Sequence, residues 1–209
     1  MDQIVGVVLS GGRSRRMGRD KAMLPHPRTG ETFLRLAVTR LASLCDPVCV
    51  CGPPGDPPQD PAFPNGVVTP RVIWLADPVS HQGPAVGIAS ALRWVSRRGH
   101  PACLVTPVDM PDLSVEDLQR LVRLWRRHPH RVVCALDESA GRVQPLVAIY
   151  PAANHRELLA LAQSEDRSLR RWLERRSPLT VPLSATALTN VNRPEDLGED
   201  AGTSEARPP

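Results

Sequence analysis

The order of hydrophobic and polar positions in the first half of the chain predicts an alternation of strands and helices. Short apolar runs, typical of strands buried on both faces of a parallel sheet, lie at 4–9, 48–51, 71–75 and 102–106. Longer segments with apolar residues every three or four positions predict helices at 32–44, 83–97 and 114–127, and Ser114 is expected to cap the last of them. We therefore expect an α/β protein in three layers, with a mostly parallel sheet and helices on both faces.

The second half predicts further strands and helices, and two segments that belong to neither. Strands are predicted at 131–136, 143–150 and 179–183, and helices at 152–163 and 167–176. Residues 53–64 carry six prolines, which predicts an irregular loop. The last segment, 198–209, has almost no apolar surface to bury and is predicted to be a disordered tail. The expected organisation is one domain over 1–197, followed by this tail.

Composition narrows the class of protein. Of the 209 residues, 41% are hydrophobic and 23% are charged, which excludes a wholly disordered chain. No apolar run reaches 18 residues, and the start of the chain lacks a signal-peptide pattern, so neither a membrane protein nor a secreted one is expected. The five cysteines are odd in number and match no zinc spacing, which predicts reduced core thiols in a cytoplasmic protein. The six histidines form no metal-ligand set.

The basic residues are almost all arginine. The net charge is +4, and a single lysine, Lys21, stands among 26 basic residues. Nucleic-acid binding is not expected, because the arginines are interleaved with acids and only 3% of residues are aromatic. In a chain that prefers arginine, a retained lysine indicates a site that needs a compact point charge.

Candidate chemistry concentrates after two predicted strands. Residues 9–21 (LSGGRSRRMGRDK) follow the first strand, and Asp109 follows the strand at 102–106. Ligands of parallel sheets bind beyond the carboxyl ends of the strands, and a glycine-rich turn there brings backbone N–H groups close to an anion. The run 9–21 is neither a Walker A loop nor a dinucleotide G-x-G-x-x-G loop. A basic surface turn is the alternative.

These residues carry a resemblance to a known family. The run L-S-G-G-x-S-x-R-M-G-x-D-K resembles the signature of the molybdenum cofactor guanylyltransferases, a family of Rossmann-like nucleotidyltransferases. Ser10 departs mildly from the usual L-A-G-G wording. Further similar segments follow in the family's order: Asp77 with GPAVGI at 83–88, TPVDMP at 106–111, QPL at 144–146 with Tyr150, and NVNRPEDL at 190–197.

The resemblance implies a site and a reaction. The reaction would be transfer of GMP from GTP to the phosphate of the molybdenum–molybdopterin cofactor, with release of pyrophosphate. The implied nucleotide contacts are Leu9, Ser10, Gly11, Gly12, Lys21, Asp77 and Asp109. The implied catalytic residues are Lys21, Arg16 and Asp109, and Asp109 would also bind Mg2+. Asp109 and Asp77 could instead be turn residues, Asn190 and Asn192 could fix a loop, and Arg142 and Gln144 could be ordinary edge-strand residues.

One departure bears on the nucleotide. The family often has asparagine at the position of Cys51, and a thiol lacks the paired donor and acceptor of an amide. Two alternatives therefore stay open: a sister enzyme that uses CTP on the same cofactor or an NTP on a sugar or alcohol phosphate, and a non-catalytic binding module. Other proteins of cofactor biosynthesis and client molybdoenzymes are the protein partners that the resemblance suggests.

Overall fold

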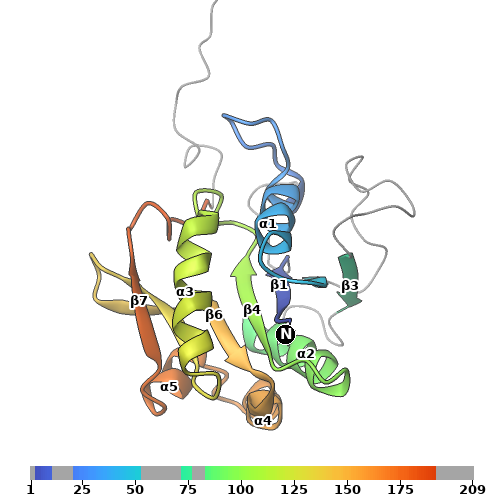
Figure 1. Ribbon diagram of the computed structural model, residues 1–209, viewed down its shortest axis with the longest axis vertical. Coiled ribbons are helices and arrows are strands. Elements are labelled where there is room, and N and C mark those ends of the chain that lie inside the picture. Colours follow the sequence, from blue (N-terminus) through green and yellow to red (C-terminus); the bar gives the residue numbers. More distant parts are fainter. Residues whose placement is uncertain (1–2, 11–20, 53–71, 77–82, 192–209) are drawn as a thin grey trace, which may run out of the picture.

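The protein is built on one seven-stranded sheet, in the strand order β3-β2-β1-β4-β6-β5-β7 (Figure 1). The structure is a computed structural model that describes residues 3–10, 21–52, 72–76 and 83–191. The strands are β1 (Val5–Leu9), β2 (Val48–Gly52), β3 (Val72–Ala76), β4 (Ala102–Pro107), β5 (Val133–Asp137), β6 (Arg142–Pro151) and β7 (Leu179–Leu183). The helices are η2 (Lys21–Met23), α1 (Phe33–Ala42), α2 (Pro84–Arg97), α3 (Val115–Arg127), η3 (Ala152–Asn154), α4 (His155–Gln163) and α5 (Leu169–Glu174).

The pairing of the strands puts several loop segments at one edge of the sheet. Strands β3, β2, β1 and β4 are parallel, so their carboxyl ends meet at the same edge. Strand β6 runs antiparallel to β4 and β5, while β5 and β7 are parallel to each other. The sheet is thus mostly parallel, as the sequence predicts. The beginning of β6 lies at the edge where β4 ends.

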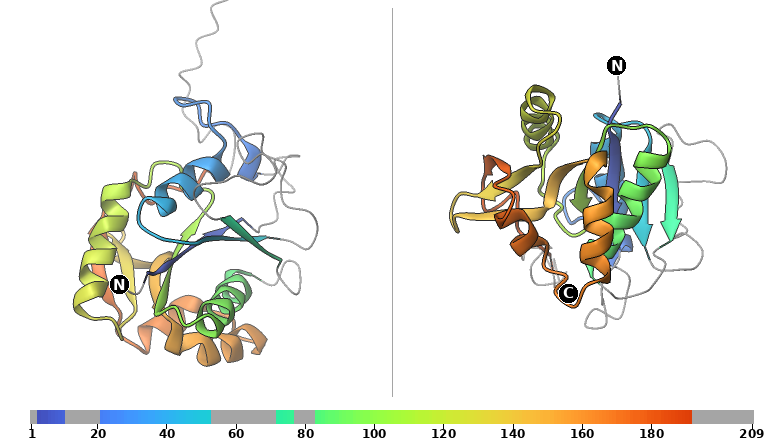
Figure 2. Two further views of the ribbon diagram at one scale, coloured as in Figure 1. Left: turned by 45° about the vertical axis from the view of Figure 1, so that its right-hand side comes forward. Right: turned by 90° about the horizontal axis from the view of Figure 1, so that it is seen from below.

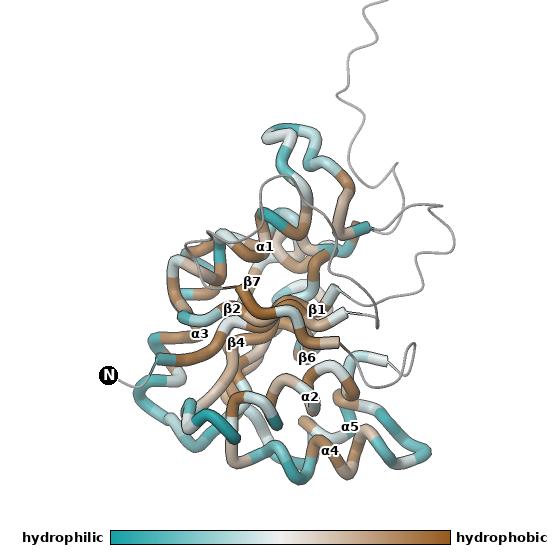
Figure 3. Tube along the Cα trace, turned by 90° about the vertical axis from the view of Figure 1, so that its right-hand side faces the viewer, coloured by the Kyte–Doolittle hydropathy of each residue, from teal (hydrophilic) through white to brown (hydrophobic). Residues whose placement is uncertain are grey.

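Helices cover both faces of the sheet (Figure 2). One apolar cluster joins the sheet to α1 and α3, and a second joins its other face to α2, α4 and α5. Neighbouring residues of β1 alternate between the two: Val8 belongs to the first cluster and Val7 to the second. The strands therefore appear as a hydrophobic centre between two helix layers (Figure 3). The predicted three-layer α/β fold is confirmed.

The positions of the helix ends follow the capping residues more closely than they follow the apolar pattern. Ser114 caps α3 as predicted, with its hydroxyl accepting the N–H of Asp117 at 3.1 Å. Thr32 lies outside α1 and caps it, accepting the N–H of Arg35 at 3.1 Å. The helix predicted at 32–44 is therefore shorter. The segment predicted at 152–163 begins as the 3-10 turn η3 before α4, and the one at 167–176 narrows to α5.

The cysteines have the character that the sequence predicts. All five are unpaired with one another and buried. Burial raises the pKa of the Cys45, Cys49 and Cys134 thiols to about 12, so these thiols are protonated near neutral pH and unreactive. Among the helices of the described residues, none is both long and apolar enough to cross a bilayer. The tail at 198–209 and the proline-rich loop at 53–64 lie outside the described residues.

Candidate functional site

The predicted site begins where β1 ends. The N–H of Ser10 donates to the carbonyl of Cys51 at 2.8 Å, and the carbonyl of Leu9 accepts the N–H of Val108 at 3.1 Å. Leu9 and Ser10 are both buried. These bonds continue the parallel pairing past the strand ends, which aligns three chain segments side by side. The start of the predicted nucleotide loop therefore lies directly beside the segment that carries Asp109.

Lys21 and Asp109 meet at this edge of the sheet. Nζ of Lys21 lies 3.5 Å from Oδ2 of Asp109, and the two side chains are 17% and 25% exposed. Lys21 begins η2, whereas Asp109 follows β4, so the pair joins two elements that are far apart in the sequence. Partial burial strengthens the attraction between these charges relative to a pair in bulk water. The two residues that the sequence singles out most strongly are thus brought together.

The turn after Asp109 lacks one donor that an aspartate turn usually has. In such a turn the carboxylate accepts the backbone N–H two residues further on. That position is Pro111, which has no N–H. The usual turn donor is therefore absent at this position, and in the described part of the chain the carboxylate of Asp109 forms an ion pair with Lys21.

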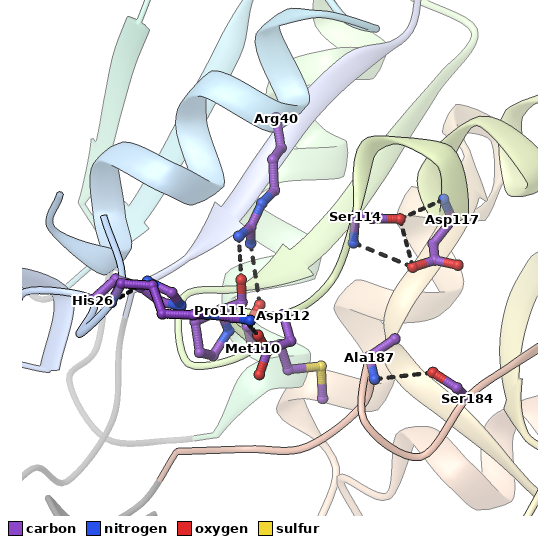
Figure 4. Close-up of polar contacts among 10 residues, drawn as sticks. His26, Arg40, Met110, Pro111, Asp112, Ser114, Asp117, Ser184 and Ala187 are labelled. Carbon is purple, nitrogen blue, oxygen red and sulfur yellow. Dashed lines mark hydrogen bonds and ion pairs between the residues drawn. The ribbon is translucent and has the colours of Figure 1, made fainter. Parts of the chain in front are cut away.

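The segment after Asp109 is tied to α1 and to residues 25–32, which precede α1 (Figure 4). We call residues 25–32 the hairpin, because Pro25 and Thr32 form an antiparallel bridge. The guanidinium of Arg40 donates from Nη1 to the carbonyl of Met110 at 3.3 Å and from Nη2 to the carbonyl of Pro111. Arg28, in the hairpin, pairs with Asp112. Nothing in the sequence distinguishes Arg40 from the other arginines, so this contact was not predicted.

His26 lies in the same hairpin and is buried. Its Nδ1 accepts the N–H of Arg28 at 3.3 Å, and its ring meets the ring of Phe33 edge to face. Burial, and then the neighbouring charge of Arg28, lower the pKa of His26 below its usual 6.5. The neutral ring is a packed part of the hairpin.

Cys51 is the next-to-last residue of the buried strand β2 and faces the start of α2. Its Sγ lies 3.8 Å from the carbonyl of Gly87, and the residue is 1% exposed. Gly83, with φ of +89°, and Pro84 begin α2. The thiol thus occupies a tight apolar position at the sheet edge, where an amide would need additional hydrogen-bond partners.

The remaining predicted residues divide into those near the edge and those outside the described residues. The N–H of Val191, next to Asn190, donates to the carbonyl of Asp109 at 2.9 Å, so the 190–191 segment supports the site through its backbone. Arg142 and Gln144 begin β6, at the edge where β4 ends. The predicted residues that lie outside the described ranges are Gly11, Gly12, Arg16, Asp77 and Asn192.

The possible metal ligands at the site suit a cation that also binds the substrate. Within the described ranges, no cluster of three histidine, cysteine, aspartate or glutamate residues could form a closed metal site. Asp109 provides one partly exposed carboxylate beside an ammonium. Mg2+ commonly binds one or two carboxylates together with substrate phosphates, so the residues present fit this ion.

Comparison with known proteins places these features in a family. The Lys21–Asp109 pair lies beyond the carboxyl ends of parallel strands of a three-layer α/β fold, which is where ligands bind in such sheets. The model of the MobA-like NTP transferase domain matches residues 6–180, and the chain belongs to this family. A relative from Rhodopirellula baltica, described as a probable molybdenum cofactor guanylyltransferase, is 43% identical over 93% of this chain and 90% of its own length.

Solved structures support the fold independently. Molybdopterin-guanine dinucleotide biosynthesis protein A from Archaeoglobus fulgidus has a TM-score of 0.67 and 22% identity, with 93% of this chain and 95% of that chain covered. The 2-C-methyl-D-erythritol 4-phosphate cytidylyltransferase from Thermus thermophilus has a TM-score of 0.60 and 22% identity, with 94% and 96% covered. Because one is named for a guanine dinucleotide and the other for a cytidylyl transfer, the fold itself does not select the nucleotide.

Proposed function

We propose that this protein transfers GMP from GTP to the phosphate of the molybdenum–molybdopterin cofactor. The products are the guanine dinucleotide form of the cofactor and pyrophosphate. The observation that carries the proposal is the Lys21–Asp109 pair at the sheet edge, in a chain of the MobA-like NTP transferase family. The 43% identical relative supports the choice of nucleotide and acceptor.

The chemistry needs charge more than it needs a base. The attacking group is an oxygen of a phosphate monoester, whose second pKa is about 6, so it is already anionic near neutral pH. Burial keeps the thiols of Cys45, Cys49 and Cys134 protonated, and His26 is packed in the hairpin, so none of these groups is placed to attack or to accept a proton. The protein has instead to reduce repulsion between two anions and to stabilise charge on the departing pyrophosphate.

Lys21 and Asp109 are suited to these two tasks. The ammonium of Lys21 would bind phosphate oxygens of GTP, while the carboxylate of Asp109 would hold Mg2+ together with phosphate oxygens. When bound, Mg2+ would supply electrostatic stabilisation of the phosphates. In the protein alone, each side chain balances the charge of the other at 3.5 Å. Their salt bridge thereby keeps both groups at the place where nucleotide and cation would bind.

The other implied contacts complete the proposal. The carbonyl of Leu9 accepts the N–H of Val108, the residue before Asp109, so Leu9 and Ser10 lie near the Lys21–Asp109 pair, and their role in nucleotide binding remains a prediction. Gly11, Gly12, Arg16 and Asp77 remain predictions from the sequence, with Arg16 assisting Lys21 at the β- and γ-phosphates. We further propose a cytoplasmic location, which the unpaired buried cysteines support. Delivery of the product to client molybdoenzymes, or contact with other biosynthetic proteins, remains a prediction.

The test is release of pyrophosphate from each of four NTPs, with molybdopterin cofactor and Mg2+ present. GTP is expected to be the preferred substrate, with release that depends on both the cofactor and Mg2+. Preference for CTP would assign the protein to the sister activity, a result that Cys51 at the end of β2 would help to explain. Absence of release with all four nucleotides would contradict a catalytic function and favour a binding module.

A further inference from the structure

The backbone around Asp109 is anchored from two directions before any side chain is considered. The N–H of Val108 donates to Leu9 at the end of β1, and the carbonyl of Asp109 accepts the N–H of Val191. The first bond holds the chain that enters the residue, and the second holds the peptide that joins Asp109 to Met110. The course of the chain beyond that peptide needs further contacts, and it constrains the direction in which the carboxylate of Asp109 points.

Arg40 provides those contacts. It lies in the last turn of α1 and donates to the carbonyls of Met110 and Pro111, the two residues that follow Asp109 (Figure 4). No ion pair among the described residues includes Arg40, and burial lowers the pKa of its guanidinium. Desolvating a guanidinium for backbone carbonyls alone is costly. Its planar fork, however, orients two consecutive carbonyls at once, which a single donor cannot do.

The same helix also holds Lys21. At the start of α1, the N–H of Phe33 donates to the carbonyl of Leu24 at 3.0 Å, and the N–H of Leu24 donates to the carbonyl of Lys21 at 3.1 Å. Ala22, within η2, is buried in the cluster that α1 forms with the sheet. Both members of the Lys21–Asp109 pair are therefore attached to α1, one near its first turn and one through Arg40 in its last.

We propose that Arg40 is a positioning residue for nucleotidyl transfer. It acts through the backbone at 110–111 and sets the carboxylate of Asp109 at the place where the cation and Lys21 need it. This inference rests on the proposed role of Asp109 in binding the cation. Arg28 provides the contrast, because it pairs with Asp112 on the same segment through an exposed side chain. An exposed ion pair of this kind contributes little.

The experiment compares Arg40→Met and Arg40→Lys with the matched control Arg28→Met. Two quantities are measured: the rate of pyrophosphate release over a Mg2+ titration, and the affinity for Mn2+ in the presence of GTP, from the electron paramagnetic resonance signal of free Mn2+. Misplacing a reacting group costs roughly tenfold to a hundredfold in rate, so Arg40→Met is expected to lower kcat by about tenfold and to weaken Mn2+ binding, with little change in the KM for GTP. Arg40→Lys keeps the charge but lacks the fork and is expected to be intermediate. Arg28→Met is expected to match the wild type.

A control separates positioning from a general loss of stability. Leu158→Ala removes a buried side chain from α4, in the opposite helix layer, and should lower the melting temperature. Assays run well below all melting temperatures should then give wild-type kcat and Mn2+ affinity for Leu158→Ala. If the Arg40 variants behave in the same way, with a lower melting temperature only, Arg40 is a structural residue and the inference is wrong. Arg40→Lys keeps the inference testable if Arg40→Met does not fold.

A double-mutant cycle distinguishes this inference from the proposed role of Asp109. If Arg40 acts through Asp109, Arg40→Met should add little to the loss of rate and of Mn2+ affinity that Asp109→Asn causes. Fully additive losses would show that Arg40 works by another route and would overturn the inference alone. Wild-type Mn2+ affinity in Asp109→Asn would instead overturn the role of Asp109, whatever the Arg40 variants do.

Discussion

Asp109 and Asp137 each stand at the carboxyl end of a buried strand, yet their carboxylates have different partners. Oδ1 of Asp137 accepts the N–H groups of Ser139 and Ala140 at 2.9 Å and 3.0 Å, and the hydroxyl of Ser139 at 2.6 Å. All of these donors belong to the turn between β5 and β6. Asp109 instead forms an ion pair with Lys21. Lys21 is distant in the sequence, so folding has to bring the two residues together.

The residue two positions further on explains the difference. After Asp137 this residue is Ser139, whose N–H and hydroxyl are both donors, so the carboxylate stabilises its own turn. After Asp109 it is Pro111, which has no N–H. A carboxylate that lacks this donor in its own turn is more available to a lysine, a cation or a substrate. Position at a strand end is therefore not enough to predict a site, and the local donors decide.

The largest expected effect comes from neutralising Asp109, with the same substitution at Asp137 as the matched control. Asp109→Asn preserves shape but removes the charge that would bind the cation, and the chemical step should slow by about a hundredfold or more, or roughly 3 kcal/mol. Asp137→Asn keeps a turn-forming side chain whose hydrogen bonds lie within its own turn, and it should leave turnover unchanged. Steady-state pyrophosphate release over a Mg2+ titration measures both, with thermal melts to confirm folding. Wild-type turnover and Mg2+ dependence in a folded Asp109→Asn protein would remove Asp109 from the site.

The partner of Asp109 provides the next test. Lys21→Ala should lower turnover strongly with little loss of stability, because Lys21 lies at the sheet edge and not in the packed core. Lys21→Arg should also be poor, by roughly tenfold, since a guanidinium is wider than the ammonium it replaces and distributes its donors differently. Rates at saturating GTP and Mg2+ measure the effect. Near-native turnover for Lys21→Arg would show that charge alone matters at this position.

Much of this fold could be predicted from the apolar pattern, because both faces of the sheet are buried. The strand β7 (Leu179–Leu183) has the predicted bounds, and Ser114 caps α3 as predicted. Helix ends are harder to predict, because they depend on capping contacts. Thr32 directly precedes the apolar residues of α1, yet it lies outside the helix as its N-cap. Periodicity alone therefore overestimates the helix at 32–44.

The site could be predicted only in part. Lys21 is conspicuous as the single lysine, and Asp109 follows a strand, so residue type and position are enough to nominate both. Arg40 and Val191 contribute through backbone contacts with the segment around Asp109, and such contacts leave no residue-type signal. Pro111 carries a weaker signal, because a proline two residues after an aspartate removes one of the donors of a local turn.

A smaller effect is expected from restoring the missing donor beside Asp109. Pro111→Ala supplies an N–H two residues on and keeps the carbonyl that Arg40 binds. The carboxylate can then form a local turn that competes with cation binding, and a hydrogen bond contributes about 0.5–1.5 kcal/mol, so the Mg2+ concentration for half-maximal rate should rise about two- to tenfold. Pro182→Ala, at an exposed position of β7, serves as the proline control. An unchanged Mg2+ requirement in Pro111→Ala would mean that the proline does not keep Asp109 available.

The smallest expected effect is a change in stability at acidic pH, and it comes from the turn of Asp137. The hydroxyl of Ser139 is the main cause that holds the pKa of Asp137 below its ordinary 3.8, assisted by the N–H of Ala140. A carboxyl whose pKa is depressed by folding stabilises the folded state above pH 3.8, and this contribution is lost as the pH falls through the folded pKa. Ser139→Ala should therefore raise the pKa of Asp137 toward 3.8 and reduce the dependence of stability on pH below that value, while activity at neutral pH stays unchanged. Titration of the side-chain carboxyl carbon by nuclear magnetic resonance measures the shift. An unmoved pKa would show that the backbone donors suffice and that the serine hydroxyl is not what occupies this carboxylate.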